Sequence, residues 1–496
     1  MLKKVARWID NRLGTSAFTQ DALNKVFPDH WSFMVGEIAL YAFVVLIVTG
    51  IFLSFFFDAS TSQSVYDGSY APLVGVEVSD AYKSTLEISL DVRAGLVMRQ
   101  THHWAALVFV AAIVVHLCRI FFTGAFRSPR ELNWIIGITL LILAIFNGFT
   151  GYSLPDDLLS GTGLRIAYSI ALSVPLLGTW MGFLIFGGEF PADQIISRLL
   201  VTHIMIVPAL IIGLLTAHLA LLWRQKHTQF PEPGRTEHNV VGSKLWPTYA
   251  AKSLGLFFGV FAILVLMGGL FQINPIWLYG PFEPQQVSSP AQPDWYLGWV
   301  DGALRLFPAV ELRAFGFEIP NPFYPGVLLP GVTFLALYAW PFLEQAFTHD
   351  REPHNLLDRP RDRPMRTALG ATTLAFYTVM FIASSSDLIA KWFTVSVLDL
   401  VRVFQVLVIL IPPAVGWATY RLMKALAGSG APRLTEMPLS ALTHPNGRGN
   451  GAFPHQERGR DAHAGGATAG DDGDGRSAAR TGGDGALPAQ RIDDRE

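Results

Sequence analysis

Eight apolar stretches, each long enough to cross a membrane as a helix, constrain this 496-residue chain more than any other feature. About 20 apolar residues span the hydrocarbon core of a bilayer, where only helices or closed barrels satisfy their own backbone polar groups. Only 15% of the residues are charged, against roughly 25% in soluble proteins. The sequence therefore predicts an all-α integral membrane protein. The predicted spans are 32–57, 96–122, 132–154, 198–223, 250–275, 323–347, 367–386 and 397–423.

The lysines and arginines indicate how these spans are oriented. The N-terminal segment and the loops after the second, fourth and sixth spans carry twice as many of these residues as the four loops opposite. Because cytoplasmic loops are enriched in lysine and arginine, both termini are expected in the cytoplasm. In the long outer loop after the third span, Pro175 and scattered glycines predict short helices rather than a ninth span.

We expect four parts along the chain. They are a cytoplasmic amphipathic segment, a domain of the first four spans, a domain of the last four spans and a glycine-rich tail that is too polar to fold. Their expected bounds are 1–31, 32–223, 224–425 and 426–496.

The charge and cysteine content exclude several classes of function. A net charge of −2 gives no indication of a nucleic-acid partner. The single cysteine, Cys118, excludes an internal disulfide, a cysteine-rich zinc site and a covalently attached c-type haem within this sequence.

Two spans each carry a pair of histidines at a helical interval. The second span contains His102 and His116, fourteen residues apart, and the fourth contains His203 and His218, fifteen apart. At 1.5 Å per residue the members of a pair lie ~21 to ~22 Å apart, within roughly 40° to 60° of one helix face. Both spans start outside, so His102 can face His203 and His116 can face His218. This arrangement predicts two bis-histidine sites at different depths in the membrane.

The first and third spans repeat the fourteen-residue interval with glycine, as Gly36 and Gly50 and as Gly137 and Gly151. Glycine has no Cβ, so a flat group can approach the helix backbone at these positions. Haem is such a group, and its iron accepts axial histidine. The four spans together predict a four-helix bundle that holds two haems.

Two basic residues and a neighbouring histidine complete this pattern. Arg99 and Arg119 lie just beyond the histidines of the second span, where they can pair with haem propionates. His103 is rotated about 100° from His102, so we interpret it as a structural or interfacial residue.

Two other classes of function remain open at this point. Intramembrane histidines also serve as helix–helix hydrogen bonds or proton relays, so a proton-coupled secondary transporter is one alternative. The chain shows no inverted repeat or matched pair of broken spans, which such transporters have. The second alternative is a membrane anchor for a redox partner, which binds haem without oxidising a substrate itself.

Three motifs carry a resemblance to a known family: R-x-x-H-x13-H-x-x-R over residues 99–119, GYSLP at 151–155 and PDWY at 293–296. Over roughly residues 25–425 the chain resembles the cytochrome b subunits of quinol:cytochrome c reductases (the bc1 complex). The resemblance implies that His102 and His203 bind the iron of a low-potential haem b, and that His116 and His218 bind that of a high-potential haem b. The expanded loop after the first span and the continuous eight-span chain look like the actinobacterial form, which implies menaquinol as substrate.

The PDWY motif is expected at the outer face, on the same side as His102 and His203. Quinol oxidation releases protons, and Asp294 is the candidate base that accepts them. Trp295 and Tyr296 are expected to line the quinol pocket, and Tyr152 lies in the same region. Read without the histidines, PDWY is a proline-led interfacial turn. The family motif usually has glutamate where this chain has Asp294, so either the pocket is narrower or a water bridges the gap.

The resemblance also implies a route for electrons and a set of partners. One electron from quinol goes to a Rieske iron–sulfur subunit and then to a c-type cytochrome subunit, and the other passes through both haems to a quinone near the cytoplasmic face. Protons are released outside and taken up inside. The family further implies a homodimer of the complex and allows a supercomplex with a terminal oxidase.

The inner quinone site is less clear from the sequence. Trp223 and Ser253 occupy the positions where the family has a histidine and an aspartate. The other polar candidates there are Arg224, His227, Tyr249 and Lys252, and each could equally be an anchor at the membrane interface. Glu37 is the main charged residue within the spans.

Overall fold

The computed structural model describes residues 2–286, 292–314 and 316–428. Among these residues, eight helices are long and apolar enough to cross a membrane, which confirms the predicted fold class. They are Trp31–Ser54, Gly95–Thr123, Glu131–Tyr152, Ile195–Gln225, Leu245–Leu270, Tyr324–Thr348, Pro364–Ala383 and Val397–Gly428.

Two predicted boundaries need comment. The fifth helix ends at Leu270 instead of 275, because Phe271 is extended and Asn274, which precedes Pro275, has a positive φ. The last helix continues to Gly428, and the predicted disordered tail beyond it lies outside the described residues.

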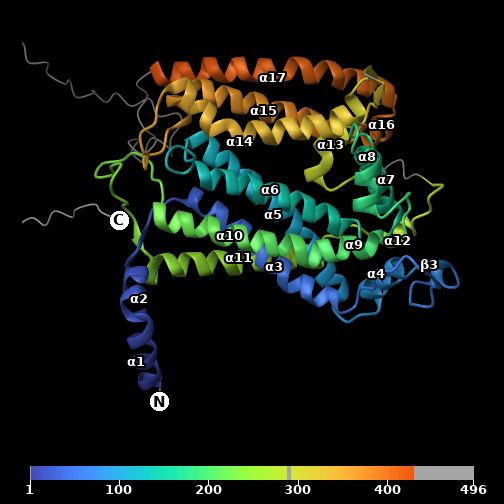
Figure 1. Ribbon diagram of the computed structural model, residues 1–496, viewed down its shortest axis with the longest axis horizontal. Coiled ribbons are helices and arrows are strands. Elements are labelled where there is room, and N and C mark those ends of the chain that lie inside the picture. Colours follow the sequence, from blue (N-terminus) through green and yellow to red (C-terminus); the bar gives the residue numbers. More distant parts are fainter. Residues whose placement is uncertain (1, 287–291, 315, 429–496) are drawn as a thin grey trace, which may run out of the picture. The chain divides into compact units, whose positions relative to one another are not determined.

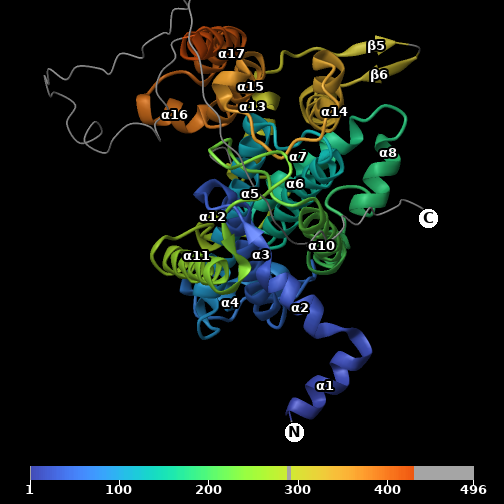
Figure 2. The same ribbon diagram turned by 90° about the vertical axis from the view of Figure 1, so that its left-hand side faces the viewer.

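The first four spans form two packed pairs of helices. Helix α3 (Val35–Ser54) packs against α5 (Gly95–Thr123). Helix α6 (Glu131–Tyr152) packs against the fourth span, which consists of α9 (Ile195–Val201), the π-helical turn η4 (Thr202–Ile206) and α10 (Val207–Gln225). Figure 1 shows the long helices running in a similar direction, and Figure 2 looks down several of them.

An apolar layer fills the middle of this four-helix bundle. Phe43, Val207 and Ile211 are buried, and side chains from all four spans pack around them. The partly buried members are Leu46, Ile47, Phe109, Leu140, Leu143 and Leu215. In sequence the layer lies between the two histidines of α5 and between the two of the fourth span.

The last four spans pack on the bundle or on one another. Helix α11 (Ala250–Leu270) packs on α3 and α5, and α14 (Leu329–Thr348) packs on α6. Helices α15 (Pro364–Ala383) and α17 (Val397–Gly428) pack on each other and on α13 (Trp295–Leu306), which follows the PDWY motif.

The connections expected outside contain short, well-capped elements. In the first, β2 (Gln63–Val65) pairs with β3 (Glu77–Ser79), and the Ser79 hydroxyl caps α4 (Asp80–Leu90). The connection after α6 contains α7 (Leu158–Leu172), which Asp157 caps, and α8 (Gly178–Met181), as the sequence predicts.

The remaining elements are short. They are α1 (Leu2–Leu13), α2 (Thr15–Asn24), β1 (Val26–Phe27), η1 (Trp31–Phe33), η2 (Ala71–Leu73), η3 (Gly182–Phe186), β4 (Ser243–Lys244), η5 (Leu245–Tyr249), α12 (Ile276–Tyr279), β5 (Leu312–Ala314), β6 (Phe317–Ile319), η6 (Tyr324–Leu328), η7 (Pro360–Asp362) and α16 (Ser386–Phe393).

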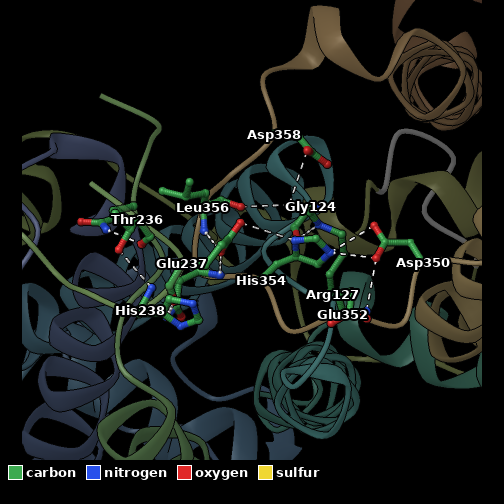
Figure 3. A network of polar contacts seen from close by, with 12 residues as sticks. Gly124, Arg127, Thr236, Glu237, His238, Asp350, Glu352, His354, Leu356 and Asp358 are labelled. Atoms are coloured by element: carbon green, nitrogen blue, oxygen red, sulfur yellow. Dashed lines mark hydrogen bonds and ion pairs between the residues drawn. The ribbon is translucent and has the colours of Figure 1, made fainter. Parts of the chain in front are cut away.

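A polar network joins three of the connections expected on the cytoplasmic side (Figure 3). Arg127, after α5, donates to the Leu356 carbonyl oxygen (2.9 Å) and pairs with Asp358 (3.4 Å). Glu237, after α10, accepts a hydrogen bond from the Leu356 backbone N–H (2.8 Å), and His354 contacts Asp350 (3.0 Å). These contacts connect the four-helix bundle to the connection between α14 and α15.

Arg366 extends this polar connection into the helices. Its side chain is 4% exposed, and its two Nη atoms lie 2.6 Å from Glu344 Oε1 and 2.7 Å from Asp358 Oδ2. A buried cation with two carboxylate partners is costly to disrupt, because each partner left alone is an unpaired buried charge.

We therefore expect Arg366→Met to destabilise the protein by about 3 kcal/mol, measured as a lower unfolding temperature of the purified protein in detergent. Arg402→Met is the control, since Arg402 pairs with Asp399 while both side chains are about 70% exposed, and such pairs contribute roughly 0–1 kcal/mol. Equal effects of the two substitutions would contradict this interpretation.

Candidate functional site

The structure brings the four predicted histidines together in two pairs. The rings of His102 and His203 have centroids 6.1 Å apart and an interplanar angle of 71°. His116 and His218 lie close enough to interact electrostatically. We call these the outer pair and the inner pair, after the predicted orientation of the spans.

His203 lies in the π-helical turn η4, directly before α10. A π-helical turn inserts one extra residue into a helix without ending it. The turn therefore makes the spacing of His203 and His218 along their helix similar to that of His102 and His116, although the first two are fifteen residues apart and the second two fourteen.

Each of the four predicted glycines lies beside a different histidine ring. A Cβ on Gly36 would be 3.2 Å from His116 Cε1, and a Cβ on Gly50 would be 3.2 Å from His102 Cε1. A Cβ on Gly137 would be 3.7 Å from His218 Cε1, whereas one on Gly151 would collide with the His203 ring. Helix α3 thus makes room for both histidines of α5, and α6 makes room for both histidines of the fourth span.

Hydrogen bonds orient the rings of the outer pair. His203 Nδ1 lies 2.9 Å from the Asn147 carbonyl oxygen, which can only accept, so Nδ1 carries the proton and Nε2 has a free lone pair. His102 Nδ1 lies 2.9 Å from Thr49 Oγ1. Such a contact on one ring nitrogen is how proteins present the other nitrogen to a metal.

The two predicted arginines are enclosed near the ends of α5. Arg99 donates one hydrogen bond to the Asn274 carbonyl oxygen (3.1 Å). The Nε and Nη2 atoms of both Arg99 and Arg119 make no hydrogen bond to any described residue. Each side chain therefore offers a buried positive charge with free donors to an anionic group.

The PDWY residues form a compact polar cluster against α5. Asp294 Oδ1 is 2.8 Å from His103 Nε2, and Asp294 Oδ2 accepts a hydrogen bond from the Tyr296 hydroxyl (2.9 Å). Trp295 Nε1 donates to the Leu107 carbonyl oxygen (3.3 Å), and Tyr152 is buried within electrostatic range of Asp294 and Tyr296. The structure thus brings together all four residues predicted for quinol chemistry.

His103 is the residue that sequence reasoning missed. The interpretation of His103 as structural or interfacial did not include its contact with Asp294, 191 residues away: Nε2 lies 2.8 Å from Oδ1, and both side chains are 13% exposed. No spacing in the sequence points to a partner so distant. Burial raises the pKa of Asp294, but the charge and hydrogen bond of His103 and the hydroxyl of Tyr296 outweigh it, so this pKa lies below its ordinary value.

Three of the predicted inner-face candidates are aromatic. Trp223, His227 and Tyr249 surround Phe27, at ring distances of 6.4, 4.8 and 4.4 Å. Burial and the nearby Lys25, Arg119 and Arg130 lower the pKa of His227 to about 4, so its ring is neutral at neutral pH.

The other candidates make polar contacts. Lys252 pairs with Asp29 (2.7 Å), and Arg224 lines a cavity with Lys25 and Lys226 at the end of α10. Ser253 and Tyr249 donate hydrogen bonds to Glu37.

Comparisons with known proteins agree with this architecture. The family described as "Cytochrome b(N-terminal)/b6/petB" matches residues 107–281. The cytochrome bc1 complex cytochrome b subunit of Mycobacterium tuberculosis is 53% identical over 422 residues, which cover 85% of this chain and 77% of that protein. The corresponding subunit of Corynebacterium diphtheriae is 49% identical over 428 residues, 86% and 79% of the two chains. The chain belongs to the cytochrome b subunits of the cytochrome bc1 complex.

This membership confirms the resemblance seen in the sequence. As a cytochrome b it is a subunit of a quinol–cytochrome c oxidoreductase, binds b-type haem and interacts with quinone. A solved structure described as "Hyperthermophilic respiratory Complex III" shares the fold, with a TM-score of 0.62 and 21% identity over 84% of this chain and 99% of that one. The family decides against the secondary-transporter alternative.

The outer pair fits the iron of a b-type haem. Imidazole is a ligand of haem iron, and the ring centroids of His102 and His203 lie 6.1 Å apart. The free lone pair on His203 Nε2 and the unpaired donors of Arg99 suit the iron and the propionates of the same group.

We expect Gly151→Ala to lower the ratio of bound b-type haem to protein, because the added methyl group would displace the His203 ring. Gly137→Ala is the matched control, since its methyl group meets His218 at an ordinary contact distance of 3.7 Å. The visible spectrum of each purified variant measures the ratio. Full haem content in Gly151→Ala would show that the glycine contact is not needed.

Proposed function

We propose that this chain is the dihaem cytochrome b of a menaquinol:cytochrome c reductase in the bacterial cell membrane. It oxidises quinol at the outer face and reduces quinone at the inner face, and this couples electron transfer to proton translocation. The observation that carries the proposal is the pair of histidine sites, in which each of four histidines lies beside its own glycine. Both termini face the cytoplasm, in line with the distribution of lysine and arginine.

In this proposal the outer pair holds the low-potential haem and the inner pair holds the high-potential haem. Bound haem supplies one-electron transfer between the two faces of the membrane. Arg99 and Arg119 bind the propionates, Thr49 and Asn147 orient the outer histidines, and the apolar layer around Phe43 excludes water between the two levels.

Asp294 accepts a proton from the quinol hydroxyl at its carboxylate. Its lowered pKa keeps it ionised, and His103 holds Oδ1 in place. Trp295, Tyr296 and Tyr152 line the pocket around the quinol ring. The shorter side chain of aspartate contacts His103 and Tyr296 directly, which supports a narrower pocket than a glutamate would have.

The partners follow from the family and from the content of the chain. The relatives are named as subunits of a bc1 complex, and a chain with one cysteine cannot itself hold a Cys-ligated iron–sulfur cluster or a c-type haem. We therefore propose a Rieske iron–sulfur subunit and a c-type cytochrome subunit as partners. The proposal extends to a homodimer of the complex and to a supercomplex with a terminal oxidase. The actinobacterial relatives favour menaquinol.

Asp294→Asn in the assembled complex is expected to lower menaquinol-driven reduction of cytochrome c by roughly 100-fold, the usual contribution of a general base, while haem content stays unchanged. Glu318→Gln, which neutralises a half-exposed carboxylate on β6, is the control. Wild-type turnover in Asp294→Asn would overturn the role of this residue. A wild-type complex that contains haem but oxidises no quinol would favour the membrane-anchor alternative.

The pH dependence of turnover tests the contact with Tyr296. Quinol oxidation needs the Asp294 carboxylate, so activity is lost as the pH falls through the pKa of Asp294. Tyr296→Phe removes a hydrogen bond that lowers this pKa, so the acid limb of the rate profile should move to higher pH. Tyr377→Phe should leave the limb in place, because the Tyr377 hydroxyl pairs with Thr333 instead. If the acid limb of Tyr296→Phe stays at the wild-type pH, the assignment of that limb to Asp294 is contradicted.

A further inference from the structure

Glu37 is an acidic residue within a membrane span, and its carboxylate is surrounded by hydroxyl groups. Oε2 accepts hydrogen bonds from Ser253 (2.6 Å) and Tyr41 (3.1 Å), and Oε1 accepts one from Tyr249. The hydroxyl oxygens of Tyr41 and Ser253 also lie within hydrogen-bond distance of each other. Carboxylates inside membrane spans are costly, so they mark functional positions by default.

The partners of Glu37 distinguish it from a purely structural carboxylate. Among the described residues, Glu37 forms no ion pair, whereas Glu344, in span α14, is neutralised by Arg366 at 2.6 Å. A fixed cation keeps a carboxylate ionised and holds it in place. Hydroxyl groups both donate and accept hydrogen bonds, so they can stabilise either protonation state and pass a proton onward.

Glu37 also lies next to the inner histidine pair along α3. It directly follows Gly36, whose backbone lies against the ring of His116 in the inner pair. Its partner Tyr249 stacks on Phe27 with ring centroids 4.4 Å apart, and the His227 ring lies 4.8 Å from Phe27. Flat aromatic surfaces of this kind suit the ring of a quinone.

Charged groups beside Tyr249 lie between the hydroxyls around Glu37 and the solvent. Asp29 lies within electrostatic range of the Tyr249 hydroxyl and pairs with Lys252 at 2.7 Å. The side chains of Lys252 and Asp29 are 48% and 40% exposed. The titratable groups that face Glu37 are therefore Tyr41 and Tyr249, with Asp29 and Lys252 beyond them toward solvent.

We infer that Glu37 is the acid that protonates quinone at the inner site, which rests on the proposed function of this chain. Reduction of a quinone to a quinol takes two electrons and two protons. The O–H bond of the Glu37 carboxylic acid breaks as an O–H bond forms on one quinone oxygen, and the second proton comes from cytoplasmic water. The two electrons come from two quinol molecules oxidised at the outer face, because each of them sends one electron across the membrane. Glu37 then takes a proton back through the hydroxyl of Tyr249.

Glu37→Gln in the whole complex tests this inference, because glutamine can keep the hydrogen bonds but cannot donate a carboxylic proton. We expect quinol to reduce the haems normally in the first turnover, since the outer site is intact. In steady state the haems should stay reduced, and cytochrome c reduction should fall at least about tenfold. Glu37→Asp should restore part of the rate. The redox-difference infrared spectrum should lose a carboxyl band in Glu37→Gln.

Glu131→Gln is the matched control, because it neutralises another carboxylate, at the start of α6, that has no contact with the Glu37 cluster among the described residues. Wild-type turnover and haem reoxidation in Glu37→Gln would overturn the inference while leaving the proposed function intact. A wild-type complex without quinol oxidation would overturn the proposed function itself.

If Glu37→Gln does not assemble with haem, Ser253→Ala tests the proposed role of Glu37 instead. It removes the 2.6 Å hydrogen bond to Glu37 and should shift the carboxyl infrared band and slow haem reoxidation several-fold. An unchanged band together with unchanged reoxidation would overturn the inference.

Discussion

Close contact between glycine backbone and imidazole is the constraint on which the rest of this structure depends. Four polar rings lie inside a membrane bundle, and each lies beside a glycine of the facing helix. At Gly36, Gly50 and Gly151 an added Cβ would crowd or collide with the ring, whereas at Gly137 it would meet the ring at an ordinary contact distance. The fourteen-residue glycine intervals of α3 and α6 equal the histidine interval of α5, and the π-helical turn at His203 accommodates the fifteenth residue in the fourth span. This match keeps the two histidine levels apart, with the apolar layer around Phe43 between them.

Three carboxylates that lie in or beside the helices differ in the groups that surround them. Arg366 neutralises Glu344, which therefore serves as part of the polar connection between helices. His103 and Tyr296 contact Asp294 and lower its pKa, so it stays ionised and can accept a proton. Among the described residues, the hydrogen-bond partners of the Glu37 carboxylate are all hydroxyl groups, which suits a group that gives and takes a proton. The environment of each carboxylate thus indicates a different role.

Much of the fold was predictable because membrane spans and helical intervals are properties of the local sequence. The eight spans, the short helices after α6 and the juxtaposition of His102 with His203 follow from hydropathy and from 3.6 residues per turn. Only one feature of the sequence indicates the π-helical turn at His203. The two histidines of the fourth span are fifteen residues apart, whereas those of α5 are fourteen apart.

Other features could not be predicted because they depend on contacts between distant segments. The pairing of His103 with Asp294 joins α5 to a loop 191 residues away. The hydrogen bonds between Glu37 and α11 require the packing of α11 on α3, which hydropathy does not specify. The four glycines were predicted to let a flat cofactor approach the helix backbone. In the structure, a Cβ added at each of them would instead lie nearest to the atoms of an imidazole ring.

A redox titration of the visible spectrum, on the purified complex and on its His203→Ala variant, tests the dihaem bundle most directly. Two b-type components of different potential, with only the lower one lost in the variant, are the predicted result. A single b-type component in the wild type, or a variant that keeps both components, would contradict the assignment of one haem to each histidine pair.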